Sequence, residues 1–195
     1  GHNVLVTGGT KGIGRAIVEI LSDEGCNIAL CARNADDVNA AVEAISAKGV
    51  KVVGKQLDVG DGDAFKAWIA AAGEELGGLD AYVSNVSGSN APGDAGWQSH
   101  FDYNIMSAVR GVEACMPFFE KSDNPSVVMI STTAALEHFI NAGPYNAMKA
   151  GLLNYSGALA QEIGAKGIRV NAISPGPIFI DGGSWDKIKQ GMTAF

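Results

Sequence analysis

Short apolar runs alternate with amphipathic segments along this chain. The apolar runs predict strands at residues 4–6, 27–32, 51–57, 80–84, 126–131 and 168–173. Apolar residues at helical spacing predict helices at 15–21, 36–47, 61–76, 97–119 and 144–163. Runs without polar alternation are typical of parallel strands covered on both faces. Strand and helix alternation with right-handed crossovers predicts an α/β, doubly wound parallel sheet, with a ligand cleft at the carboxyl ends of its strands.

Closely spaced glycines join the first strand to its helix. Gly8, Gly12 and Gly14 form the pattern TGxxxGxG. Glycines let the backbone approach a pyrophosphate, and the free N–H groups of the following helix favour anions. This stretch therefore predicts a dinucleotide site, with a purely structural turn as the alternative.

Composition restricts the possible function classes. The chain has 195 residues, 47% hydrophobic and 18% charged, which fits one globular domain spanning residues 1–195. A net charge of -7 argues against binding to nucleic acid or to an anionic membrane. We find no secretory signal and no apolar run of about 20 residues. The three cysteines show no ligand spacing, so we expect no metal site and a cytoplasmic location.

The residue after the second strand bears on cofactor choice. Arg33 stands where an acid that binds the ribose of NAD is expected, and its planar guanidinium can pair with a 2′-phosphate. Lys11 adds a second positive charge in the glycine turn. We interpret Asp36 and Asp37 as helix-capping charges. The pattern favours NADP(H), unless Arg33 is only a solvated strand end.

A tyrosine and a lysine lie on one face of the helix after the fifth strand. Tyr145 and Lys149 are four residues apart, so their side chains share a helix face. A nearby cation favours the phenolate of a tyrosine, whose ordinary pKa is about 10. The preceding strand ends in hydroxyl groups at Ser131, Thr132 and Thr133. Together these residues predict acid–base chemistry at one site.

The motifs TGGTKGIG, YNAMK and NAISPGP, with the hydroxyl-bearing strand end, resemble the small single-domain branch of the short-chain dehydrogenase/reductase family. The resemblance covers nearly the whole chain and implies a Rossmann-like sheet in the order 3-2-1-4-5-6. It also implies a nicotinamide cofactor and interconversion of a carbonyl and an alcohol. Within this family, the overall sequence most resembles the 3-oxoacyl carrier-protein reductases. The family's helix pairing implies a homo-oligomer, a dimer or tetramer.

The resemblance assigns roles by position. Tyr145 would be the general acid in reduction, Lys149 would lower its pKa and bind the nicotinamide ribose, and Asn104 would support a proton-relay water. Thr132 would hold the substrate oxygen. The residues assigned to cofactor binding are Gly8, Thr10, Lys11, Gly12, Ile13, Gly14, Arg33, Asn34, Asp58, Val59, Asn85, Tyr145, Lys149, Pro175, Gly176 and Ile178.

Three positions depart from the family pattern. The serine expected 13 residues before the tyrosine is Thr132, with Ser131 beside it, and neighbouring strand residues point to opposite faces. We prefer Thr132 on spacing. Ser87 replaces a glycine of the family's NNAG motif, and Ile180 replaces a threonine that contacts the cofactor amide.

The C-terminal end is the largest departure, because family members usually continue through a further helix and a seventh strand. We expect either that part of the protein is not included in this sequence or that an edge strand is absent, which would leave the sixth strand uncovered. Residues 178–195 would begin a substrate lid. Four apolar residues are candidates for a hydrophobic pocket or for core packing: Phe139, Ile140, Phe179 and Trp185.

Two functions from different classes follow. The first is an NADPH-dependent oxidoreductase, in which Tyr145 gives the proton and Thr132 holds the carbonyl. The second is a non-catalytic NADP-binding sensor or interaction protein on the same fold. The retained Tyr145, Lys149 and Asn104 favour the enzyme.

Overall fold

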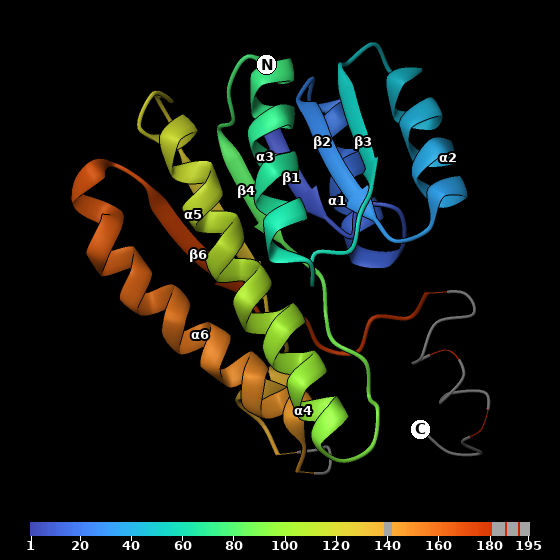
Figure 1. Cartoon of the computed structure of the whole chain (residues 1–195), viewed down its shortest axis with the longest axis vertical. Coiled ribbons are helices and arrows are strands. Elements are labelled where there is room, and N and C mark those ends of the chain that lie inside the picture. Colours follow the sequence, from blue (N-terminus) through green and yellow to red (C-terminus); the bar gives the residue numbers. More distant parts are fainter. Residues whose placement is uncertain (139–141, 181–185, 187–190, 192–195) are drawn as a thin grey trace.

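Six parallel strands form one sheet at the centre of the protein. The computed structural model describes residues 1–138, 142–180, 186 and 191. The strand order is β3-β2-β1-β4-β5-β6, and the prediction of a doubly wound sheet is confirmed (Figure 1). The strands are β1 (Asn3–Thr7), β2 (Asn27–Ala32), β3 (Val52–Gln56), β4 (Ala81–Ser84), β5 (Ser126–Ile130) and β6 (Arg169–Ile173).

Helices cover both faces of this sheet (Figure 1). One face packs against α1 (Gly12–Asp23) and α2 (Ala35–Ser46). The other packs against α3 (Gly62–Leu76), α5 (Ser107–Phe119) and α6 (Pro144–Ile163). The remaining helical segments are α4 (Asp94–His100), the π-helix η1 (Phe101–Met106) and the 3₁₀ turns η2 (Thr133–Ala135) and η3 (Gly164–Lys166).

Side-chain alternation divides the core into two apolar layers. Leu5 of β1 packs in the layer beneath α3 and α5, whereas Val4 and Val6 pack in the layer beneath α1 and α2. All three are at most 4% exposed. A central strand that is buried on both faces explains the continuous apolar run in the sequence.

Two regions differ from a plain strand and helix alternation. The single helix predicted at 97–119 is instead α4, η1 and α5 in succession, because the π-helical segment interrupts the α-helical hydrogen bonding. On β6, Val170 and Ala172 pack against the core, while Arg169, Asn171 and Ile173 are exposed. Within the described sheet, β6 thus has one uncovered face.

Candidate functional site

The glycine turn between β1 and α1 is tightly closed. Gly8 and Gly12 have φ angles of 66° and 58°, which favour glycine. A Cβ on Gly14 would lie 2.2 Å from the Gly8 carbonyl oxygen and 2.5 Å from Asn85 Nδ2. A side chain at position 14 would therefore push the turn apart. Thr10 and Ile13 lie partly buried in the same turn.

Asn85, directly after β4, holds this turn to the neighbouring strand. Its side-chain amide donates to the Thr7 carbonyl at 3.0 Å and to the Gly8 carbonyl at 3.4 Å. Its main-chain N–H donates to the Thr7 hydroxyl at 3.0 Å. The carboxyl ends of β1 and β4 are thereby fixed together at the point where the strand order reverses.

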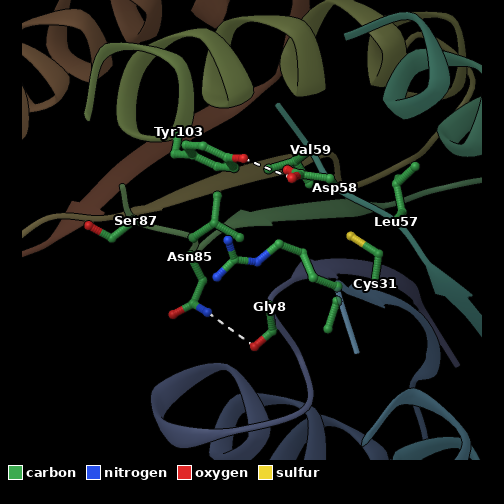
Figure 2. A pocket seen from close by; sticks show the side chains of 11 residues that line it. Gly8, Cys31, Leu57, Asp58, Val59, Asn85, Ser87 and Tyr103 are labelled. Carbon is green, nitrogen blue, oxygen red and sulfur yellow. Dashed lines mark hydrogen bonds between the residues drawn. The ribbon is translucent and has the colours of Figure 1, made fainter. Parts of the chain in front are cut away.

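A pocket of about 280 Å³ opens beside the turn (Figure 2). It brings together several predicted cofactor residues that are far apart in the sequence, among them Arg33, Asp58 and Asn85. Arg33 and Asp58 also line an adjoining open pocket. The full lining is Gly8, Cys31, Ala32, Arg33, Leu57, Asp58, Val59, Asn85, Val86, Ser87 and Tyr103.

Tyr103 is a pocket residue that the sequence analysis missed. Its phenol donates to Asp58 Oδ2 at 2.8 Å across the pocket (Figure 2). Burial and the Asp58 carboxylate raise the pKa of Tyr103, while the positive charge of Arg33 acts in the opposite direction. Arg33 lines the same pocket as this pair. The only signal for Tyr103 in the sequence is that it directly precedes Asn104.

The cation in the glycine turn has a partner. Lys11 Nζ lies 2.6 Å from Asp37 Oδ2, and the Lys11 side chain is 75% exposed. The capping residue of α2 is Asn34, whose side-chain oxygen accepts from the Asp37 N–H at 2.9 Å. Asp37 thus lies in the first helical turn as predicted, but its carboxylate also pairs with Lys11.

The hydroxyl groups that follow β5 have different partners. Ser131 Oγ donates to the Lys149 carbonyl oxygen at 3.0 Å. Thr132 Oγ1 accepts from the Ala134 N–H at 3.3 Å, so its own hydroxyl proton is available to another acceptor. Both residues are buried, at 4% and 8% exposure.

The end of β6 runs alongside this segment. Ser131 N–H donates to the Ile173 carbonyl at 2.7 Å, and Thr133 N–H donates to the Pro175 carbonyl at 3.0 Å. The predicted Pro175–Gly176 turn therefore lies next to the strand end that carries Thr132. Gly176 and Ile178 are exposed.

Helix α6 carries Tyr145 and Lys149 into the same region. Pro144 occupies its first turn, and Asn146 Oδ1 accepts from the Gly143 N–H at 3.1 Å. Lys149 is 2% exposed, and its ammonium donates to the Ile130 carbonyl oxygen at 2.6 Å. Burial lowers the pKa of Lys149 to about 8.

Asn104 lies buried in η1, facing the loop after β4. Its Oδ1 accepts from the Gly88 N–H at 3.2 Å, and its Nδ2 lies 2.9 Å from His100 Nδ1. The His100 ring meets the Tyr145 ring edge-on, with centroids 5.7 Å apart. His100 is a second residue that the sequence analysis missed. π-Helical segments are frequent at functional sites.

The described residues fit a dinucleotide. The closed glycine turn, the pocket beside it and the free end of α1 suit a pyrophosphate and its nucleoside. Acid–base groups on α6 and η1 lie at the same carboxyl edge of the sheet. This arrangement can bind a cofactor and exchange a proton beside it.

Comparison with known proteins settles the family. The model of the short chain dehydrogenase family matches residues 2–184. The chain belongs to the short-chain dehydrogenase/reductase family. It is 35% identical over 194 residues to isoepoxydon dehydrogenase of Penicillium expansum, covering 95% of this chain and 74% of that one. It is therefore an oxidoreductase of this family, acting on small molecules.

Solved short-chain dehydrogenase/reductase structures share the fold. L-Sorbose reductase from Gluconobacter frateurii, complexed with NADPH and L-sorbose, superposes with a TM-score of 0.88 at 30% identity, covering 98% of this chain and 80% of that one. Carveol dehydrogenase from Mycobacterium avium, in complex with NAD, gives 0.83 at 26% identity, covering 90% and 70%. Members of both cofactor classes thus resemble this short-chain dehydrogenase/reductase, which supports a nicotinamide cofactor.

Some predictions fall outside the described residues. Phe139, Ile140 and Trp185 do so, as does most of the lid expected at 178–195. Phe179 is described and is 55% exposed. None of the helices described in the structure has the length and apolar character needed to span a membrane.

Proposed function

We propose that this short-chain dehydrogenase/reductase uses NADP(H) to interconvert a carbonyl and a secondary alcohol. The observation that carries the proposal is the set of contacts around His100, whose ring packs against Tyr145, whose Nδ1 contacts Asn104, and on which the charge of Lys149 acts. Tyr103, directly before Asn104, lines the same pocket as Arg33. Bound NADPH supplies the hydride.

The chain's own residues divide the remaining work. In reduction, Tyr145 donates a proton to the carbonyl oxygen, and Thr132 donates the hydrogen bond that orients this oxygen. Lys149 binds the nicotinamide ribose, and its positive charge favours the phenolate that Tyr145 becomes. With its pKa at about 8, Lys149 remains mainly protonated at neutral pH. Asn104 supports the water that returns a proton to the site.

The proposed preference for NADP(H) over NAD(H) rests on positively charged side chains near the expected position of the cofactor's adenosine. Arg33 borders both pockets that Asp58 lines, and Lys11 lies on the facing glycine turn. The Lys11–Asp37 pair does not oppose the proposal, because an exposed ion pair contributes only about 0–1 kcal/mol and can open. Gly8, Thr10, Gly12, Ile13 and Gly14 would hold the pyrophosphate. Asn34, Asp58, Val59, Asn85, Pro175, Gly176 and Ile178 complete the proposed binding set.

The substrate class extends this proposal. We expect a small ketone or a 3-oxoacyl thioester, as the general resemblance to carrier-protein reductases implies. A homo-oligomer is expected from the family's helix pairing. The three cysteines are free and buried, which suits the reducing cytoplasm.

The test combines binding and turnover. NADPH fluorescence on titration with protein measures binding, and loss of NADPH absorbance with a panel of ketones and acyl-thioester analogues measures reduction. Tyr145→Phe should bind NADPH normally and lose about 10²–10⁴-fold in kcat, whereas the control Tyr155→Phe, on the same helix, should retain activity. Binding without turnover across the panel would favour the NADP-binding sensor instead.

A further inference from the structure

His100 lies between two of the proposed catalytic residues. The residue is 1% exposed, and both ring nitrogens have partners. Nδ1 lies 2.9 Å from Asn104 Nδ2, and Nε2 lies 3.1 Å from Asn90 Oδ1. The ring also packs edge-on against Tyr145, at an interplanar angle of 68°.

The hydrogen bonds determine which nitrogen of His100 carries the proton. The Gly88 N–H can only donate, so the Asn104 atom that faces it is the carbonyl oxygen. The opposite end of the Asn104 side chain is then its NH₂ group, which can only donate. His100 Nδ1 must therefore accept through its lone pair. The proton lies on Nε2, which donates to Asn90 Oδ1.

These hydrogen bonds are compatible only with a neutral His100 imidazole. A protonated imidazole carries N–H groups on both nitrogens, so Nδ1–H would meet the NH₂ group of Asn104, donor against donor. Burial, and then the positive charge of Lys149, lower the pKa of His100 below its ordinary 6.5. The surroundings therefore keep the ring neutral at neutral pH.

The charged groups around the ring are few among the described residues. Helix α6 contributes Tyr145 and Lys149, and the loop after β4 contributes only neutral partners, Gly88 and Asn90. On the ring's own helical segment, Asp102 accepts from Gln98 at 3.0 Å. The electrostatic effect on His100 is therefore that of a nearby cation.

We infer that His100 is a positioning residue, which holds the Asn104 amide and the Tyr145 ring in their working geometry only while its imidazole is neutral. The inference rests on the proposed function, since it gives Asn104 and Tyr145 a reaction to serve. Protonation of His100 releases Asn104 and places a second positive charge beside Lys149. The reduction rate then falls in mildly acidic solution.

Two substitutions distinguish the positioning role of His100 from a role in packing alone. His100→Asn keeps an acceptor near the place of Nδ1 and does not titrate, whereas His100→Leu has no acceptor. We expect His100→Leu to lower kcat by roughly 10–100-fold at pH 7.5, because small displacements of catalytic groups are costly. The dissociation constant of NADPH should change less than about 2-fold, and His100→Asn should recover most of the lost kcat.

The pH profile is the readout that a structural role would not change. Wild-type kcat should fall on the acid side with an apparent pKa below 6.5, and His100→Asn should flatten this limb. An acid limb of the same shape in both proteins would overturn the inference. So would equal kcat values for His100→Leu and wild type.

A measurement without turnover tests the protonation state of His100 separately from the proposed function. ¹⁵N NMR of histidine-labelled protein gives the tautomer and pKa of each ring, and the loss of one signal in His100→Asn assigns it among the three histidines. We expect protonated Nε2 and a pKa below 6.5. Protonated Nδ1, or a pKa at or above 6.5, would overturn the inference even in an active enzyme. If no carbonyl is reduced, the proposed function fails while the tautomer still decides how His100 holds Asn104.

Discussion

The Ser131 hydroxyl donates to the main-chain carbonyl oxygen of Lys149, 3.0 Å away. This bond ties the end of β5 to helix α6 and uses the only proton that the hydroxyl has. The neighbouring Thr132 hydroxyl accepts from Ala134 and keeps its proton. These two hydrogen bonds explain why Thr132, and not Ser131, is the candidate for orienting a substrate oxygen.

Substitution of the two hydroxyl residues should therefore affect different properties, catalysis for Thr132 and stability for Ser131. Thr132→Val should lower kcat by about 10²–10³-fold, as expected when an oxyanion donor is lost. Ser131→Ala should mainly lower the free energy of unfolding, by about 1 kcal/mol. Steady-state kinetics and urea unfolding measure both. A larger kcat loss in Ser131→Ala than in Thr132→Val would reverse the assignment.

Arg33 should distinguish the two nicotinamide cofactors. Replacement by Asp removes a charge-assisted hydrogen bond to the 2′-phosphate, so NADPH binding should weaken by roughly 10–100-fold and NADH binding much less. Fluorescence titration with each cofactor measures this. Arg169→Asp, which makes the same charge change at the start of β6, is the control. Equal losses for NADPH and NADH would remove Arg33 from the phosphate site.

The Lys11–Asp37 ion pair predicts a gain of affinity. Asp37→Asn removes the partner that lies 2.6 Å from the Lys11 ammonium, so Lys11 becomes free to meet a phosphate. We expect NADPH to bind about 2–5-fold more tightly, in keeping with the small free energy of exposed ion pairs. The gain should shrink at high salt. Unchanged or weaker NADPH binding at low salt would show that Lys11 does not contact the phosphate.

Burial of Lys149 predicts a pH-dependent stability. Because the pKa of Lys149 is about 8 in the folded chain and 10.5 as its ordinary value, the unfolded chain binds more protons between these pH values. The free energy of unfolding should therefore rise with pH across this window relative to Lys149→Met, by roughly 1–3 kcal/mol. Taking the difference in the free energy of unfolding between wild type and Lys149→Met cancels the contributions of the cysteines and tyrosines that titrate in the same pH range. A flat difference would show that the ammonium is not desolvated.

Local patterns predicted the strands and most helices because periodicity reports which residues are buried. The second strand and the last long helix have the predicted bounds, residues 27–32 and 144–163. The π-helical segment around Asn104 was predicted as ordinary α-helix, since both place apolar residues at similar spacing over one turn. Its change in hydrogen bonding depends on tertiary packing.

Contacts between side chains that are far apart in the sequence could not be predicted from these patterns. Tyr103 and Asp58 are 45 positions apart, and their segments meet where α3, which follows Asp58, packs beside α5, which follows Tyr103. His100 carried no motif, and its partnership with Tyr145 exists only after α4 and α6 pack together. The Lys11–Asp37 pair likewise joins two motifs that the sequence presents as separate.

Transfer of a labelled hydride tests the central claim most directly. The protein is incubated with NADPH deuterated at either position of nicotinamide C4 and with the carbonyl panel, and the products are analysed by mass spectrometry. We predict that one of the two labelled cofactors gives an alcohol with a single deuteron on its carbinol carbon, and that Tyr145→Phe gives almost none. Bound NADPH that transfers no deuterium to any carbonyl would contradict the account.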